Sequence, residues 1–173
     1  ALDVGPGDLV LTTAFTFFAT VSAITLTGAT PVLADVDPET LNIDADHVRR
    51  ILEGDCPVHA RVGIRPDAVK VLLPVHLYGQ MADMDRVMEV ASDHGLAVVE
   101  DAAQAIGARR GSEPVGSWGV ATGFSLHPLK NLNVWGDAGV IVTRDDAVAD
   151  HLRLLRNHGM KTRDEIALWG HNS

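Results

Sequence analysis

The sequence GFSLHPLKNLNVWGDAGVIVT, residues 123–143, places a lysine between two segments that are typical of β-strands. The first strand ends at Ser125, the second runs from Ala138 to Thr143, and Lys130 lies in the polar connection between them. A buried ammonium group is unfavourable unless it is paired or chemically used, but a lysine can also pack its stem while its head reaches water. The function of Lys130 therefore depends on what the rest of the chain brings to it.

Strands and helices alternate on both sides of this stretch. Short apolar runs predict further strands over residues 9–12, 30–36, 69–75 and 96–100. Apolar periodicity with terminal signals predicts helices over residues 13–28, 44–54, 83–94 and 147–156, and one turn of helix over 102–108. This alternation predicts an α/β fold of three layers, in which helices cover both faces of a mostly parallel sheet.

The composition bounds the class of protein. The chain has 173 residues, enough for one domain with a core, and 46% of them are hydrophobic. Its net charge of −9, from 14 basic and 23 acidic residues, argues against nucleic acid or an anionic membrane as a partner. There is one cysteine, no signal peptide and no long apolar run, so we expect a cytoplasmic protein without disulfides.

A polar stretch over residues 55–67, with two prolines and no clear period, is interpreted as a surface insertion. Cys56 and His59 lie in this stretch. A Cys-x-x-His pair without a second pair falls short of a zinc site, so we expect no metal site.

Polar side chains follow the predicted strands at their carboxyl ends, where open α/β sheets bind ligands. They include Asp35, His76, Asp101 and Ser125, and Lys130 follows Ser125 by five residues. The sequence thus predicts a carboxylate, a hydroxyl and an amine at one edge of the sheet.

Several cofactor classes lack their sequence signals. A Gly-x-Gly-x-x-Gly turn after the first strand, a phosphate-binding Walker motif and a Gly-x-Ser-x-Gly elbow are all missing from the sequence. A magnesium phosphotransferase could use Asp35 and Asp101 but would not need the lysine. A pyridoxal phosphate (PLP) enzyme needs all three groups: a lysine for the Schiff base, an aspartate for the pyridine nitrogen and a hydroxyl for the phosphate.

Ordered sequence blocks carry a resemblance to one family of such enzymes. The blocks are Thr13–Thr20, Pro74–Gly79, Glu100–Gln104, Phe124–Asn131, Gly136–Gly139 and Gly170–Ser173. In this order they resemble the DegT/DnrJ/EryC1/StrS family of PLP-dependent nucleotide-sugar aminotransferases, which have fold type I. The resemblance covers the whole chain except the insertion near 55–67.

The resemblance implies a role for four polar residues. Lys130 would form the Schiff base with the cofactor, and Asp101 would pair with the pyridine nitrogen. Gln104 would contact the 3′-oxygen, from the same face of a helical turn as Asp101. Ser125 would bind the phosphate.

The resemblance also implies an aromatic ring and a partner subunit. Phe17 would stack on the cofactor ring, whereas Phe15 or Phe18 could simply be core residues. Asn172 would reach the phosphate of the neighbouring subunit, which implies a homodimer with shared active sites. His76 and His127 lie on the same rim, where we expect ordinary polar packing with substrate contact as the alternative.

The implied reaction moves an amino group from an amino acid, expected to be glutamate, to a keto sugar attached to a nucleotide. Lys130 would be the base for the proton shift, and a lysine here argues against the related sugar 3-dehydratases, which have a histidine. Two alternatives are a related PLP enzyme acting on a cyclitol or aminoshikimate-type ketone, and a non-catalytic relative that only binds the cofactor or dimerises. Residues 1–173 are expected to be the central part of the PLP-binding large domain, without its N-terminal segment and the C-terminal small domain.

Overall fold

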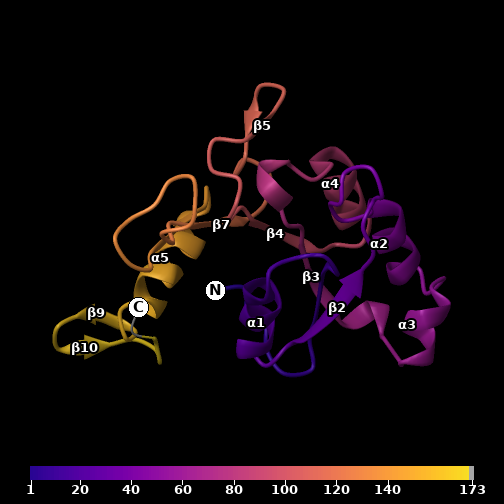
Figure 1. The fold of residues 1–173 in the computed structure, drawn as a ribbon. Coiled ribbons are helices and arrows are strands. Elements are labelled where there is room, and N and C mark those ends of the chain that lie inside the picture. The colour runs from indigo at the N-terminus through magenta and orange to yellow at the C-terminus, as the bar shows by residue number, and fades with distance from the viewer. Residues whose placement is uncertain (172–173) are drawn as a thin grey trace.

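The computed structural model describes residues 1–171 and is built around one six-stranded sheet (Figure 1). Its strands are β1 (Leu9–Thr13), β2 (Thr30–Ala34), β3 (Val69–Leu73), β4 (Ala97–Asp101), β7 (Ala121–Ser125) and β8 (Gly139–Val142). The strand order is β2-β1-β3-β4-β7-β8, and every neighbouring pair is parallel except β7 with β8. The predicted mostly parallel sheet is confirmed.

Helices cover both faces of this sheet. The helices of eight or more residues are α1 (Phe18–Leu26), α2 (Ala45–Leu52), α4 (Met84–Asp93) and α5 (Asp146–Leu155). Side chains of α2 and α4 pack with Leu11 and Leu72 on one face, whereas Ile24 of α1 packs with Val10 and Val71 on the other. Neighbouring residues of a strand point to opposite faces, so the alternation of these contacts establishes the three layers.

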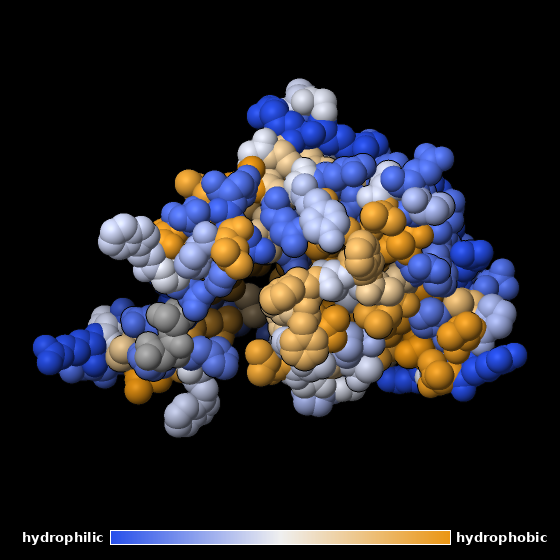
Figure 2. Space-filling view, viewed as in Figure 1, coloured by the Kyte–Doolittle hydropathy of each residue, from blue (hydrophilic) through white to orange (hydrophobic). Residues whose placement is uncertain are grey.

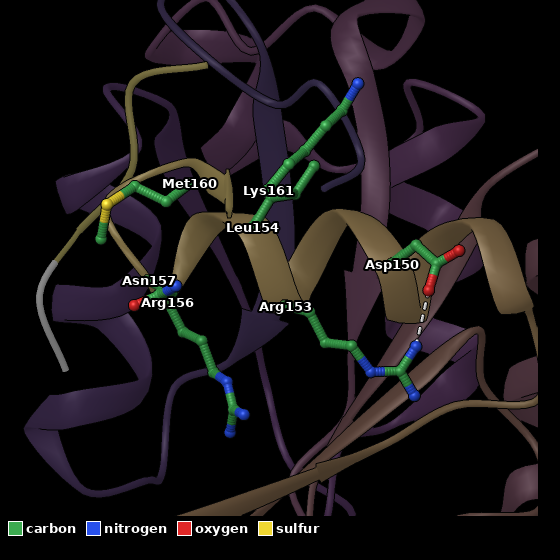
Figure 3. A pocket seen from close by; sticks show the side chains of 7 residues that line it. All are labelled: Asp150, Arg153, Leu154, Arg156, Asn157, Met160 and Lys161. Atoms are coloured by element: carbon green, nitrogen blue, oxygen red, sulfur yellow. Dashed lines mark hydrogen bonds and ion pairs between the residues drawn. The ribbon is translucent and has the colours of Figure 1, made fainter. Parts of the chain in front are cut away.

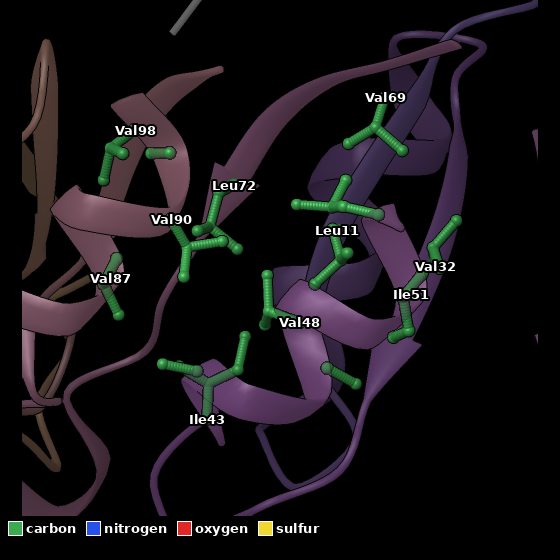
Figure 4. Close-up of a cluster of buried hydrophobic side chains, with 14 of the residues drawn as sticks. Leu11, Val32, Ile43, Val48, Ile51, Val69, Leu72, Val87, Val90 and Val98 are labelled. Carbon is green, nitrogen blue, oxygen red and sulfur yellow. The ribbon is translucent and has the colours of Figure 1, made fainter. Parts of the chain in front are cut away.

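The larger core lies between the sheet and the helices α2 and α4 (Figure 4). It contains Leu11, Val48, Leu72 and Val87, each at most 1% exposed. Burying one such aliphatic side chain contributes about 2 kcal/mol. This core therefore holds β1, β3 and the two helices in place, and with them the strand ends that carry polar side chains.

The first helix begins later than its sequence pattern predicts. A helix from Thr13 is wrong, because Thr13 is the last residue of β1 and the helix starts only at Phe18. Thr13 pairs with Ala34 of β2, and its hydroxyl accepts a hydrogen bond from the Phe15 N–H in a tight turn. Pairing in the sheet thus outweighs the local helical pattern over the first five residues.

The other helices match their predictions to within a few residues. Asp44 caps α2 by accepting from the Asp46 N–H, and Asp145 caps α5 by accepting from the N–H groups of Ala147 and Val148. The predicted helical turn over 102–108 is wrong, since these residues form consecutive turns without a helix.

Smaller elements lie outside the central sheet. The predicted surface insertion includes a short helix, α3 (Pro57–Arg61). Two single turns, η1 (Pro66–Ala68) and η2 (Leu77–Gly79), are 3-10 helices. Two hairpins project from the body: β5 (Arg109–Arg110) with β6 (Glu113–Pro114), and β9 (Met160–Thr162) with β10 (Glu165–Ile166) (Figure 1). Within residues 1–171, no helix has the length and apolar character needed to cross a membrane.

Candidate active site

Asp101 and Ser125 end neighbouring parallel strands, so both lie at one edge of the sheet. Asp101 of β4 stands opposite Gly123 of β7. Both side chains line a hollow of about 850 Å³ on the face that carries α1 and α5. Figure 2 shows the surface opening between these two parts of the molecule. The predicted meeting of a carboxylate and a hydroxyl is thus present in the fold.

The Asp101 carboxylate is held by two hydrogen bonds. Its Oδ2 accepts from the Thr20 hydroxyl of α1 at 2.7 Å, and its Oδ1 accepts from the Ala103 N–H at 3.0 Å. The Thr20 hydroxyl also lies 2.8 Å from the hydroxyl of Thr16. Thr20 was not singled out from the sequence, although it closes the block 13–20, because only the fold brings α1 against the end of β4.

Lys130 lies in the polar connection after β7, beside a second hollow of about 560 Å³. Gln104 and Tyr78 line the same hollow, and the Gln104 Oε1 accepts from the Tyr78 N–H at 2.7 Å. Among residues 1–171, the Lys130 ammonium has no ion pair with a carboxylate. The lysine is therefore not held by a structural salt bridge.

The expected site residues fall into two adjoining groups. Asp101 and Ser125 share the hollow between α1 and α5, whereas Gln104 and Lys130 share the other. The expectation that Asp101 and Gln104 lie on one face of a helical turn is wrong, because the chain between them turns without forming a helix. Four polar residues are thus gathered at one rim, but they line two hollows.

The two remaining expected residues stay predictions. Phe17 directly precedes α1 and is 69% exposed, and it lines neither hollow. Phe15, a neighbouring ring, packs edge to face against Tyr78 at a centroid distance of 6.5 Å. Asn172 lies outside the described residues.

The two rim histidines differ in their surroundings. His76 is fully buried, with Nε2 3.0 Å from the Glu100 carboxylate and Nδ1 accepting from the Ala82 N–H, so it packs in the interior and does not face substrate. His127 is half-exposed, and its Nε2 lies 3.7 Å from the Asp137 carboxylate. For His76 the expected polar packing is confirmed.

Glu100, one residue before Asp101, is a fully buried carboxylate with an unusually complete set of donors. Besides His76, it accepts from the Thr122 hydroxyl and from three backbone N–H groups of the loop before β7. These donors are Gly116, Trp118 and Gly119. Burial would raise the pKa of Glu100, but the hydrogen bonds from His76, Gly119 and Gly116 more than offset it and lower the pKa to about 2.

A further hollow, of about 580 Å³, lies over α5 (Figure 3). It is lined by Asp150, Arg153, Leu154, Arg156, Asn157, Met160 and Lys161. Arg153 donates to Asp150, three residues before it on α5, at 2.6 Å. None of the expected site residues lines this hollow, so it is not the candidate active site.

Comparison with known families decides between the classes that could use this rim. The model of the DegT/DnrJ/EryC1/StrS aminotransferase family matches residues 1–173. The chain belongs to this family. The resemblance inferred from the ordered sequence blocks is confirmed.

Two curated relatives match the chain over its whole length. The pleiotropic regulatory protein of Geobacillus stearothermophilus is 46% identical over 173 residues. A UDP-N-acetyl-3-dehydro-alpha-D-glucosamine 3-aminotransferase of Acidithiobacillus ferrooxidans is 43% identical over 173 residues. In each case the match covers 100% of this chain and 43% of the relative, so the chain spans less than half the length of these proteins.

Solved structures show the same fold. DesV of Streptomyces venezuelae, in complex with a ketimine intermediate, matches with a TM-score of 0.88 at 40% identity; the match covers 99% of this chain and 43% of that one. The fold is therefore that of the large domain of fold type I aminotransferases, of which this chain covers part. Other matching structures contain the cofactor in its pyridoxamine or pyridoxal phosphate form.

The donor set at the rim fits such a cofactor. The Asp101 carboxylate is oriented at a strand end and suits a protonated ring nitrogen, and the Ser125 hydroxyl opens to the same hollow and suits a phosphate. Lys130 supplies an amine without a competing carboxylate among the described residues. These are the residue types that PLP requires.

Proposed function

We propose that the full-length protein is a PLP-dependent aminotransferase that moves an amino group from an amino acid, glutamate by preference, to a keto sugar attached to a nucleotide. Residues 1–173 are then the central part of its PLP-binding large domain. The observation that carries the proposal is the Asp101 carboxylate, held by Thr20 at the strand end beside Ser125. The aminotransferase name of the Acidithiobacillus ferrooxidans relative supports the choice of substrate class.

Each rim residue has a distinct task in this proposal. Asp101 would keep the pyridine nitrogen protonated, and Thr20, whose hydroxyl donates to Asp101 Oδ2, would orient the carboxylate. Ser125 would donate to the phosphate, and Gln104 would contact the ring oxygen. When bound, PLP supplies an electron-withdrawing ring that stabilises negative charge on the carbon next to the amino group.

Lys130 has two tasks, which are to bind the cofactor aldehyde and to move a proton. For the second task its Nζ must be a neutral amine when it accepts the proton, and it must return that proton at the neighbouring carbon. A lysine tied to a carboxylate would be a poor base, and the described residues place no carboxylate against it. Lys130 lines one hollow, and Asp101 and Ser125 line the other at the same rim.

The proposal includes a homodimer in which Asn172 of one subunit reaches the phosphate site of the other. Exposed apolar side chains at the start of α1 and on the connection after β7 support an interface there; they include Phe17, Phe18, Leu129 and Trp135. The cytoplasmic location expected from the sequence stays a prediction.

A second candidate is a regulatory relative that binds PLP without turnover. The name of the Geobacillus stearothermophilus relative, a pleiotropic regulatory protein, favours it. A third is an enzyme of the same chemistry acting on a cyclitol or aminoshikimate-type ketone.

The test uses the natural full-length protein, purified without cofactor and titrated with PLP. We expect a new absorbance band from the cofactor bound to Lys130, a borohydride-reducible link to that residue, and loss of both in Lys130→Ala. Lys161→Ala is the matched control and should keep both signals. An unchanged reducible adduct at the same site in Lys130→Ala would overturn the assignment.

Turnover separates the three candidates. With glutamate and a panel of keto acceptors, the proposed enzyme aminates nucleotide-linked keto sugars, and a cyclitol enzyme aminates free cyclic ketones. A regulatory relative shows the absorbance band with no product from any acceptor.

A further inference from the structure

Two histidine rings bind backbone groups at the edge of the sheet that β2 forms. β2 is an edge strand, so alternate N–H and C=O groups of its chain have no strand partner. His59 Nε2 lies 3.0 Å from the Leu33 carbonyl, and the Asp35 N–H, just past the strand, donates to His47 Nδ1 at 2.8 Å. The two rings thus bind the edge where another strand would otherwise pair.

The thiol of Cys56 lies between these two rings. Its Sγ is 2.9 Å from His59 Nδ1 and 3.4 Å from His47 Nε2, and the cysteine is buried. The sulfur and the two ring nitrogens all lie within 4.8 Å of one another. They come from α2, from the start of α3 and from α3 itself, on the side of the sheet away from the candidate active site.

The spacing of Cys56 and His59 alone did not predict this cluster. The third group, His47, lies nine residues before Cys56 on α2, and only the packing of α2 and α3 against the edge of β2 brings it to the thiol. Three nitrogen and sulfur donors within this distance are the ligand types that zinc takes in proteins.

Hydrogen bonds at the far side of each ring fix which nitrogen is available. A carbonyl can only accept, so His59 carries its proton on Nε2, and its Nδ1 presents a lone pair toward Cys56. A ring whose outer N–H is held by a backbone carbonyl is the arrangement common in histidine metal ligands. His47 instead accepts at Nδ1, so its Nε2 carries the proton that points at the sulfur.

We propose that His47, Cys56 and His59 form a binding site for one divalent cation of the zinc class. Cys56 Sγ and His59 Nδ1 are the two ligands already oriented, His47 Nε2 is the third, and water completes a tetrahedral shell. Thiolate and imidazole ligands exclude the oxygen-seeking cations magnesium and calcium.

Binding requires a defined movement of protons. The Cys56 thiol releases its proton to solvent, and the His47 proton moves from Nε2 to Nδ1, where the Asp35 N–H then loses its acceptor. His59 needs no change. His47 is therefore the weakest of the three ligands, because its ring must change tautomer and give up the hydrogen bond from the Asp35 N–H, whereas the ring of His59 is already oriented.

The experiment titrates metal into the full-length protein, reduced and freed of metal by chelator, with and without PLP. We expect calorimetry with Zn²⁺ to give one saturable site per chain, and Co²⁺ to give the intense absorbance of a cobalt–thiolate bond. Cys56→Ser and His59→Gln should abolish both signals, whereas His47→Gln should weaken Zn²⁺ binding by about 10-fold. His94→Gln changes a histidine directly after α4; it is the matched control and should bind like the wild type.

Two outcomes would overturn the proposal. One is wild-type protein without a cobalt–thiolate band; the other is Zn²⁺ binding that survives Cys56→Ser and His59→Gln unchanged. A second measurement does not rely on ligand variants, which could misfold. In the wild type and in His94→Gln, Zn²⁺ should slow the alkylation of Cys56 by iodoacetamide. Neither measurement depends on aminotransferase activity, so the two proposals can fail separately.

Discussion

At the scale of single residues, the Glu100 carboxylate holds together the chain segments that form the rim. It lies next to Asp101 in β4, and its carboxylate binds the loop over residues 116–119 that leads into β7. It also binds the ring of His76, and the backbone N–H of His76 in turn donates to the Asp101 carbonyl. One buried charge thus joins the ends of β3, β4 and β7, where the candidate site lies.

We expect this charge to make stability depend on pH in acid. The pKa falls from its ordinary 4.5 to about 2 in the folded protein, so the ionised carboxylate stabilises the fold above pH 4.5. That contribution, about 3 kcal/mol, is lost as the pH falls from about 4.5 to 2. Glu100→Gln should lower the free energy of unfolding by about 3 kcal/mol at pH 7 and should flatten its acid dependence.

Urea unfolding at several pH values checks this prediction. Glu113→Gln, at an exposed position of β6, is the matched control and should behave like the wild type. If Glu100→Gln kept the full loss of stability between pH 5 and 3, another carboxylate would be responsible for it.

Thr20 carries the second residue-scale prediction. Its hydroxyl donates to Asp101 at 2.7 Å, so Thr20→Val leaves one oxygen of that carboxylate without this donor. We expect the affinity for PLP to fall about 10-fold, the value of one hydrogen bond to a charged group. Thr20→Ser keeps the hydroxyl and should restore binding.

Absorbance titration with PLP measures the change, and Thr25→Val, at an exposed position of α1, is the control. Equal affinities for Thr20→Val and the wild type would show that Thr20 does not position Asp101 for the cofactor.

The rim could be predicted from the sequence only where strand order determines it. Asp101 and Ser125 were predicted correctly to lie together, because parallel strands end at the same edge. Thr20 and His47 could not be predicted, since each meets its partner through the packing of a helix against a strand distant in the chain. The residues next to Thr20 and His47 in the sequence carry no pattern that predicts these contacts.

The loop before β7 makes a prediction at the scale of elements. A Cβ on Gly119 would lie 2.6 Å from the Val98 carbonyl oxygen and 3.2 Å from its carbon, and both are backbone atoms of β4. Gly119→Ala must therefore push the loop away from β4 and weaken the Gly119 N–H bond to Glu100. We expect a loss of about 2 kcal/mol in the free energy of unfolding.

Gly123→Ala is the control for this element, because nothing lies within 4 Å of a Cβ at that position of β7. Its stability should equal or slightly exceed that of the wild type, since alanine restricts the unfolded chain. If Gly119→Ala left the free energy of unfolding unchanged, the loop would have another way to bind Glu100.

Elements were predicted best where burial and local pattern agree. The strands β3 and β4 and the helices α2, α4 and α5 were predicted to within a few residues, because caps such as Asp44 and Asp145 mark the ends of helices. The start of α1 was predicted wrongly, since Thr13 pairs with β2 in the sheet. The sequence of residues 13–17 suits a helix, and only the neighbouring strand shows why it does not form one.

At the scale of the whole molecule, large apolar side chains remain exposed on α1 and on the connection after β7. Phe18 on α1 is 76% exposed, and Trp135, in the connection after β7, is fully exposed. Figure 2 shows apolar side chains gathered over α1. Exposed apolar side chains of this kind are found at interaction sites, and the proposed homodimer needs a contact near both candidate hollows.

We therefore expect Phe18→Asp and Trp135→Asp to dissociate the full-length dimer, because each places a charge in the apolar contact at a cost of about 2 kcal/mol or more. Sedimentation equilibrium should show an increase in the dissociation constant of at least about 10-fold. Val62→Asp changes an apolar side chain of the insertion that is 69% exposed, and it should leave the dimer intact. Since Asn172 is proposed to act across the interface, the two dissociating variants should also bind PLP more weakly at low protein concentration and recover as the concentration rises. A dimer unaffected by both substitutions would place the interface elsewhere and remove the support for a shared active site.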